Sequence, residues 1–179
     1  MTGQPGGDDR ARFAAVVQPN LDDAFALARW LTGNRTDAED VVQEACLRAY
    51  RAIAGFSGGN ARAWVLTIVR HTAYTWLRRN RSASLVMTDD LEAVERTHTD
   101  AGSQEKSTPE TELIAKADAA RLEAAIAELP APFKETLVLR DVQGLDYREI
   151  ADITEVPIGT VMSRLARARR RLAVRITKD

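Results

Sequence analysis

A long polar and acidic segment, residues 84–117, divides this sequence into two parts. It carries eight acidic and three basic residues, is rich in Thr and Ser, and shows no sustained helical periodicity. Unstructured loops longer than about 15 residues are uncommon inside a compact domain. The segment is therefore predicted to be a flexible linker between two domains, at 13–83 and 118–179.

Both flanking parts are predicted to be helical. Gly and Pro lie between periodic apolar segments, and no alternating run of β-branched residues is long enough for a strand. Helices are predicted over 21–31, 36–53, 61–80, 110–128, 133–142, 146–153 and 157–176. Gly33 and Asn34 end the first helix, and Thr36 with Glu39 forms a capping-box pattern at the start of the second. The predicted fold class is all-α, with two small helical domains.

The sequence argues against several classes of protein. No stretch approaches the roughly 20 apolar residues of a membrane span, and the N-terminal residues lack the apolar run of a signal peptide. The single cysteine, Cys46, cannot form an intramolecular disulfide, and with His71 and His98 it gives no metal-ligand spacing. No Gly-rich phosphate loop or Ser/His/Asp arrangement occurs. We therefore expect a cytoplasmic protein without membrane insertion, metal or cofactor, and not an enzyme.

The net charge of −1 conceals an uneven distribution of charge. Seven arginines and no carboxylate lie between Glu44 and Asp89, and residues 156–178 carry seven basic residues and no acid. A clustered basic surface is the electrostatic signature of nucleic-acid binding. Each of the two flanking parts is therefore predicted to present a basic surface.

The helix predicted over 61–80 has a broad apolar face and a narrow basic one. A rotation of about 100° per residue places Trp64 and Trp76 on the apolar face, where they are predicted to be core residues. The narrow face holds Thr67, Arg70, His71, Tyr74, Arg78 and Arg81. Arginines can bind phosphates and an aromatic ring can stack on an unpaired base, so this face is predicted to bind a single strand. A solvated basic face is the alternative.

The last two predicted helices fit a helix-turn-helix, with Pro157 at the start of the second, where its fixed φ is tolerated. The second helix is predicted to bury Val161, Leu165, Ala168 and Leu172. Its opposite face presents Thr160, Ser163, Arg164, Arg167, Arg170 and Arg171. Small polar residues near the N-terminal end and arginines along the helix are typical of a recognition helix in the major groove. A charged surface helix is the alternative.

Asp37, Asp40 and Glu44 form an acidic edge on the helix predicted over 36–53. Catalytic carboxylates would require a pocket and shifted pKa values, which an exposed edge does not provide. A docking surface or a solvated face is therefore predicted, and the neighbouring Cys46 is predicted to pack.

Four segments resemble a known family: 31–45 (LTGNRTDAEDVVQEA), 63–70 (AWVLTIVR), 144–151 (GLDYREIA) and 157–169 (PIGTVMSRLARAR). Their order and spacing resemble the extracytoplasmic-function (ECF) group of bacterial RNA polymerase sigma factors. The resemblance implies a non-catalytic subunit that directs core RNA polymerase to promoters, as in stress responses. One departure is His71, where many members carry Asn, and it leaves the preferred −10 base open.

The resemblance also implies roles for individual residues. Docking on the polymerase β′ clamp is implied for Asp37, Asp40, Val41, Gln43 and Glu44. Opening and reading of the −10 element is implied for Phe56, Asn60, Ala61, Arg62, Thr67, Arg70, His71, Tyr74 and Arg78. Reading of the −35 duplex is implied for Thr160, Ser163, Arg164, Arg167, Arg170 and Arg171. The implied partners are core RNA polymerase, through its β′ clamp and β subunit, promoter DNA and an anti-sigma protein.

Two other functions fit part of the pattern. A helix-turn-helix regulator that binds DNA without polymerase would explain the C-terminal part, but not the acidic edge and basic face of the first part. An interaction protein that titrates a regulator would show no DNA affinity in the presence of core polymerase.

Overall fold

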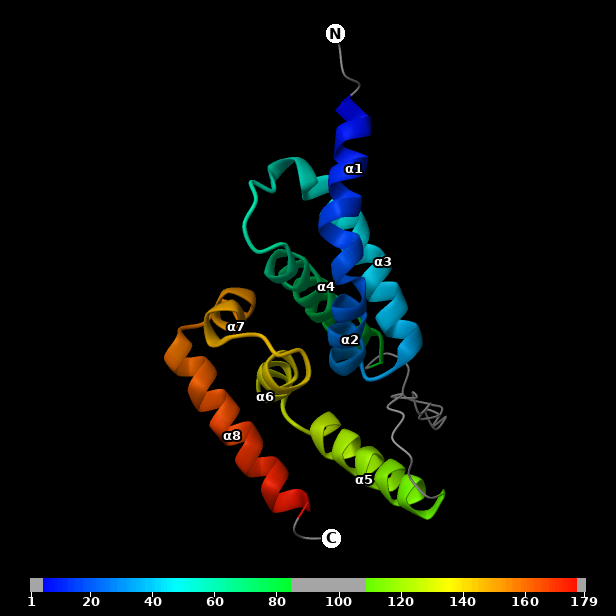
Figure 1. The fold of residues 1–179 in the computed structure, drawn as a ribbon, viewed down its shortest axis with the longest axis vertical. Coiled ribbons are helices and arrows are strands. Elements are labelled where there is room, and N and C mark those ends of the chain that lie inside the picture. Colours follow the sequence, from blue (N-terminus) through cyan, green and yellow to red (C-terminus); the bar gives the residue numbers. More distant parts are fainter. Residues whose placement is uncertain (1–4, 85–108, 177–179) are drawn as a thin grey trace.

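The computed structural model describes residues 5–84 and 109–176, and the side chains of residues 8–80 and 117–176. Every regular element in these ranges is helical, which confirms the all-α class (Figure 1). The helices are α1 (Pro5–Val17), α2 (Leu21–Thr32), α3 (Arg35–Ala52), α4 (Ala61–Ser84), α5 (Pro109–Ala127), α6 (Ala131–Leu137), α7 (Tyr147–Thr154) and α8 (Ile158–Ile176). Among the described helices, none is both long and apolar enough to cross a bilayer.

Helices α1 to α4 form the N-terminal domain, in which α2, α3 and α4 pack against one another. Their contact faces combine larger residues such as Leu27, Val41 and Leu66 with alanines such as Ala28 and Ala45, all of them buried. Small residues let the helix axes approach closely, while the larger side chains fill the space between them. Trp64 and Trp76 are partly buried against this core, as predicted.

Helix α1 was not expected from the sequence. It begins at Pro5, upstream of residue 13, and it packs against α3 and α4. Gly6 and Gly7, which disfavour a helix, obscured its start. Val17 is fully buried, and the Phe13 ring meets the Tyr50 ring of α3 edge-on at 5.5 Å.

The start of α3 corrects the predicted capping box. Gly33 ends α2 with a φ of 90°, a left-handed conformation that glycine adopts without strain. The N-cap of α3 is then Asn34, whose Oδ1 accepts a hydrogen bond from the Asp37 amide at 2.8 Å. Thr36 is therefore inside the helix, and Glu39 accepts instead from Arg35 Nε at 2.9 Å.

Helices α5 to α8 form the C-terminal domain. The helix predicted over 133–142 is observed as α6 followed by a π-helical turn, η3 (Val138–Val142), in which the Gln143 amide donates to the Val138 carbonyl at 3.0 Å. Asp146 and Glu149 form a capping box that starts α7. Glu155 ends α7 in a left-handed conformation, and α8 follows as the second helix of the predicted helix-turn-helix.

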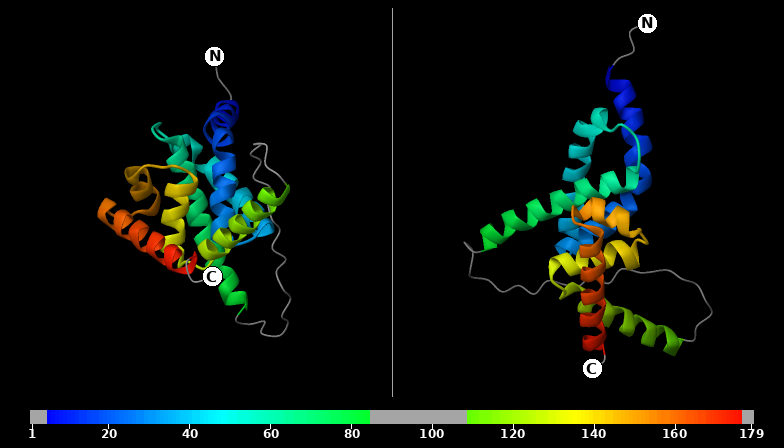
Figure 2. Two further views of the ribbon diagram at one scale, coloured as in Figure 1. Left: turned by 60° about the horizontal axis from the view of Figure 1, so that its bottom comes forward. Right: turned by 90° about the vertical axis from the view of Figure 1, so that its left-hand side faces the viewer.

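The two domains pack against each other in this structure. Helix α4 contacts α7, and α2 contacts α6, as two further views show (Figure 2). Buried apolar residues of both domains form one cluster. The predicted linker, 84–117, lies mostly outside the described residues, so the domain boundaries stay a prediction.

Candidate nucleic-acid and polymerase interfaces

The acidic edge lies on the exposed side of α3. Asp40 and Gln43 are exposed, while Asp37 and Glu44 are partly exposed. Arg48 Nε donates to Glu44 Oε1 at 2.8 Å, and this hydrogen bond lowers the pKa of Glu44. Glu44 therefore stays ionised at neutral pH.

Val41 corrects the predicted polymerase contacts. Its side chain is fully buried in the hydrophobic core, so it has no surface to offer a partner and serves as a core residue. Leu47, which the sequence analysis missed, is 54% exposed and lies one turn after Glu44 on the same face. A large apolar side chain at an exposed position is the signal that could have identified it. We call Asp37, Asp40, Gln43, Glu44 and Leu47 the α3 surface.

The loop between α3 and α4 is held at both ends. Gly58 and Gly59 have φ values of 102° and 96°, which glycine permits. The Phe56 ring packs on the Trp64 ring with centroids 4.9 Å apart. Asn60 caps α4 by accepting from the Ala63 amide at 2.9 Å. A guanidinium nitrogen of Arg12, in α1, donates to the Phe56 carbonyl, a tie that the sequence analysis missed.

Helix α4 brings the predicted −10 residues together on one side. Ala61 and Thr67 are partly buried there, and the Thr67 hydroxyl donates to the Ala63 carbonyl at 2.8 Å, so it can only accept from a ligand. Arg78 is exposed. We call Arg62, Arg70, His71, Tyr74 and Arg78 the α4 basic face. Arg70, His71, Tyr74 and Arg78 belong to the face predicted from the helical period, whereas Arg62 lies about two turns before Arg70 and was not placed on that face.

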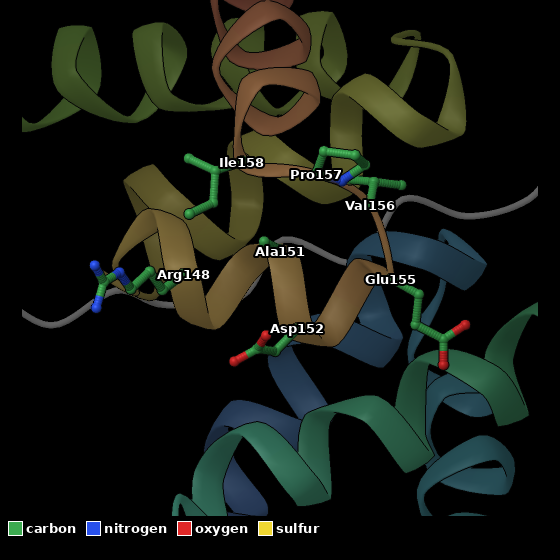
Figure 3. A pocket seen from close by; sticks show the side chains of 7 residues that line it. All are labelled: Arg148, Ala151, Asp152, Glu155, Val156, Pro157 and Ile158. Atoms are coloured by element: carbon green, nitrogen blue, oxygen red, sulfur yellow. The ribbon is translucent and has the colours of Figure 1, made fainter.

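The α4 basic face is turned toward the C-terminal domain. Arg62 Nη2 donates to the Gln143 carbonyl at 2.7 Å, while its Nε pairs with Asp23 of α2 at 2.6 Å. His71 Nε2 lies 3.3 Å from Glu155 Oε1 at the end of α7. Figure 3 shows Glu155 and Asp152 on the side of α7 that faces α4, at the helix-turn-helix turn. Asn60 Nδ2 also donates across the boundary, to Glu149 Oε1 at 2.6 Å.

The most buried of these contacts joins α4 to Glu135 of α6. Arg70 Nε donates to Glu135 Oε2 at 3.0 Å, and the Tyr74 hydroxyl donates to the same oxygen at 2.6 Å. Glu135 is 1% exposed, and its Oε1 has no hydrogen-bond partner. Burial raises the pKa of Tyr74, and Glu135 adds to this effect, so the phenol remains a proton donor at neutral pH.

Helix α8 presents most of the predicted −35 residues to solvent. Ser163, Arg167, Arg170 and Arg171 are exposed, whereas Thr160 and Arg164 are partly buried. Arg171 lies over the Phe133 ring at 5.0 Å. The positive charge of Arg164 acts to lower the pKa of Tyr74 in α4, so this part of α8 lies near the N-terminal domain. Exposed Ile158 and Met162, which the sequence analysis did not single out, lie near the start of α8.

No metal site was expected, and the described part of the chain brings no three metal-binding side chains together.

Cys46 is partly buried against the core, and burial raises the pKa of its thiol. A thiol in such surroundings is poorly ionised and weakly reactive. The structure is consistent with packing as the role of this cysteine.

Comparison with known proteins identifies the family. The family model of Sigma-70 region 2 matches residues 16–83, and that of Sigma-70 region 4 matches residues 119–172. The ECF RNA polymerase sigma-E factor of Haemophilus influenzae is 33% identical over 166 residues, covering 91% of this chain and 86% of that protein. The chain belongs to the ECF RNA polymerase sigma factors. The sigma-E factor of Escherichia coli K12 is 34% identical to this ECF sigma factor over 170 residues, which cover 91% and 85% of the two chains.

Two solved structures share the fold of this ECF sigma factor. The sigma factor RpoE, from the co-crystal structure with the anti-sigma factor NepR from Bartonella quintana, has a TM-score of 0.74 at 28% identity, covering 93% of this chain and 98% of that one. CnrH, solved with the cytosolic domain of CnrY, has a TM-score of 0.64 at 22% identity, covering 93% and 88%. The α3 surface and α4 basic face lie within the region 2 match, and the α8 residues predicted to read the −35 element lie within the region 4 match.

Proposed function

We propose that this ECF sigma factor directs core RNA polymerase to promoters and that three of its surfaces have separate roles in this process. The α3 surface binds core RNA polymerase, loop 56–60 with the α4 basic face opens and reads the −10 element, and α8 reads the −35 element. The observation that supports this most strongly is the α4 basic face. It gathers arginines, a tyrosine and a histidine on one side of a helix whose other side forms the domain core.

The chemistry of the α4 basic face suits an unpaired strand. The Arg70 guanidinium lies 5.0 Å from the Tyr74 ring centroid, so a cation and an aromatic surface are presented together. Arginine donors bind phosphate oxygens, and a ring or imidazole can stack on a base that has left the duplex. The loop that precedes α4 carries Phe56, whose ring is already fixed against Trp64.

Helix α8 suits duplex DNA for different reasons. It follows α7 in a helix-turn-helix, the motif that places its second helix in the major groove. Ser163 and Arg164 are nearer the N-terminal end, where base edges are reached, and Arg167, Arg170 and Arg171 lie along the helix, where phosphates are reached.

The same reasoning supports a non-catalytic role. The proposed activity requires binding energy toward polymerase and DNA and no chemical step by this chain, so we propose that it is not an enzyme. Core polymerase and chromosomal DNA are its proposed partners, and its proposed location is therefore the cytoplasm. Because the related RpoE is described in a complex with an anti-sigma factor, we also propose an anti-sigma partner for this chain.

Run-off transcription with purified core polymerase tests the proposal. Specific transcripts are expected from candidate promoters only when both the core and this chain are present. The promoter DNA is also titrated with the chain alone in a gel-shift assay. Promoter-specific binding without core, together with an absence of transcripts, would instead support a polymerase-independent regulator.

A further inference from the structure

Arg70 and Tyr74 form a small anion-binding site on α4. They lie one turn apart, and their donors converge on a single oxygen, at 3.0 Å from Arg70 Nε and 2.6 Å from the Tyr74 hydroxyl. Helix α4 contains no acidic residue of its own. The anion that occupies the site therefore comes from elsewhere, and in this structure it is the Glu135 carboxylate of the C-terminal domain.

The Glu135 carboxylate is closely bound to this site. Its side chain is 1% exposed, while that of Arg70 is 16% exposed. An ionised carboxylate removed from water is stable only when charge and hydrogen bonds compensate for the lost hydration. Arg70 and Tyr74 supply both to Oε2, and the other oxygen, Oε1, has no hydrogen-bond partner. Glu135 therefore joins α6 to α4 through a buried carboxylate that depends on Arg70 and Tyr74.

Carboxylate and phosphate oxygens are chemically alike as ligands for this site. Both are anionic acceptors that guanidinium and hydroxyl groups bind through short, charge-assisted hydrogen bonds. We propose that the Arg70–Tyr74 site binds two anions in mutually exclusive fashion: the Glu135 carboxylate when the domains are closed, and a backbone phosphate of the single-stranded −10 element when they separate. This inference rests on the proposed function, which assigns the α4 basic face to that strand.

Two neighbouring contacts fit the same exchange of a carboxylate for a phosphate. Asn60 Nδ2 donates to Glu149 Oε1 at 2.6 Å, and His71 Nε2 lies 3.3 Å from Glu155 Oε1. Three acidic side chains of the C-terminal domain thus lie against four of the residues assigned to the −10 strand, which are Asn60, Arg70, His71 and Tyr74. Exposed pairs of this kind contribute little, whereas Glu135 is buried, so Glu135 is the most important of the three carboxylates.

The test uses the full-length chain and Glu135→Gln, which keeps the shape of the side chain and removes its charge. Binding of a labelled oligonucleotide carrying a non-template −10 strand is measured by fluorescence anisotropy, and the radius of gyration by small-angle X-ray scattering. The variant is expected to be more extended and to bind the strand at least about tenfold more tightly, since a charge-assisted hydrogen bond no longer competes. Adding Arg70→Ala to Glu135→Gln is expected to abolish the increase in affinity for the strand.

Asp141→Asn is the matched control. It also neutralises one carboxylate of the C-terminal domain, but Asp141 pairs with Arg169 of the same domain, at 2.6 Å. Neither its radius of gyration nor its affinity for the strand is expected to change. Tyr74→Phe is a second way to open the interface if Glu135→Gln fails to fold in a melting experiment. It removes one donor to Glu135 and keeps the ring, and it is expected to extend the chain.

Unchanged scattering and unchanged strand affinity in Glu135→Gln, or unchanged scattering in Tyr74→Phe if that variant must be used, would overturn the inference. An extended Glu135→Gln chain without tighter strand binding would also overturn it, because Glu135 would then join the domains without competing for the strand. Run-off transcription by wild type with core polymerase is scored separately. Its absence would count against the proposed function, whereas its presence beside a failed Glu135→Gln result would refute the shared site alone.

Discussion

Leu47 provides a sharp test of the α3 surface, because it is the one large apolar side chain in that set. It lies on the same face as Asp40 and Glu44 and leaves 54% of its surface in water. If core polymerase covers this face, that apolar surface is buried on binding. Leu47→Ala is therefore expected to weaken binding to core polymerase while leaving the fold intact.

The size of the effect follows from the exposed fraction. Complete burial of a leucine side chain contributes about 1.5–3 kcal/mol. Since roughly half of Leu47 is already buried in the free chain, binding can add only about 0.8–1.6 kcal/mol. Dissociation constants change tenfold for every ~1.4 kcal/mol, so the variant is expected to bind core polymerase about four- to fourteenfold more weakly.

The affinity is measured by titrating core polymerase into a fluorescently labelled chain. Leu122→Ala in α5 is the matched control, because Leu122 is a leucine of similar exposure, 42%, outside the α3 surface. Its dissociation constant is expected to equal that of wild type. If Leu47→Ala binds core polymerase as tightly as Leu122→Ala does, the α3 surface is solvated and its assignment to polymerase is wrong.

Four further substitutions test the other assignments. Asp40→Lys is expected to weaken core binding in the same titration without changing helicity by circular dichroism, and an unchanged constant would contradict docking through the acidic edge. Arg164→Ala is expected to cost about 1–3 kcal/mol and relax preference at one −35 position, whereas Arg167→Ala weakens binding to all sequences alike and reduces the salt dependence. A promoter library that cannot tell the two apart would refute this division. Arg12→Gln removes the charged donor to the Phe56 carbonyl and is expected to reduce permanganate reactivity of the −10 region more than it reduces initial promoter binding. Arg10→Gln, at an exposed position of the same helix, is the control. Equal losses of permanganate reactivity and promoter binding in Arg12→Gln would contradict a role in promoter opening.

The helices that could be predicted are those whose burial pattern is periodic and whose ends carry Gly or Pro. Helix α2 is an example, with its apolar stripe and Gly33 at its end. Helix α1 escaped because Gly6 and Gly7 weaken the local signal, while its stability comes from packing on α3 and α4. The cap of α3 was misplaced by two residues because Thr36 and Asn34 are both good N-cap residues, and only the backbone geometry distinguishes them.

Some residues of the candidate site could be predicted from the sequence, and others could not. The helical period alone groups Arg70, His71 and Tyr74 on one face, since neighbours on a helix surface are three or four residues apart. Their partner could not be predicted, because Glu135 is 65 residues away from Arg70 and lies in a helix whose pattern only suggests burial. Leu47 was missed for the opposite reason: a leucine in an amphipathic helix is expected to face the core.

The backbone at Glu155 has a consequence for how this chain can evolve. Its φ of 57° is left-handed, a conformation that costs a residue with a side chain about 1–2 kcal/mol and glycine almost nothing. Glycine at this position would therefore suit the turn of an isolated helix-turn-helix better, but it would lose the carboxylate that meets His71. Selection of the C-terminal domain alone for heat resistance is expected to replace Glu155 with glycine. Selection on the whole chain, where the two domains meet, would retain an acidic side chain at the expense of a more relaxed turn.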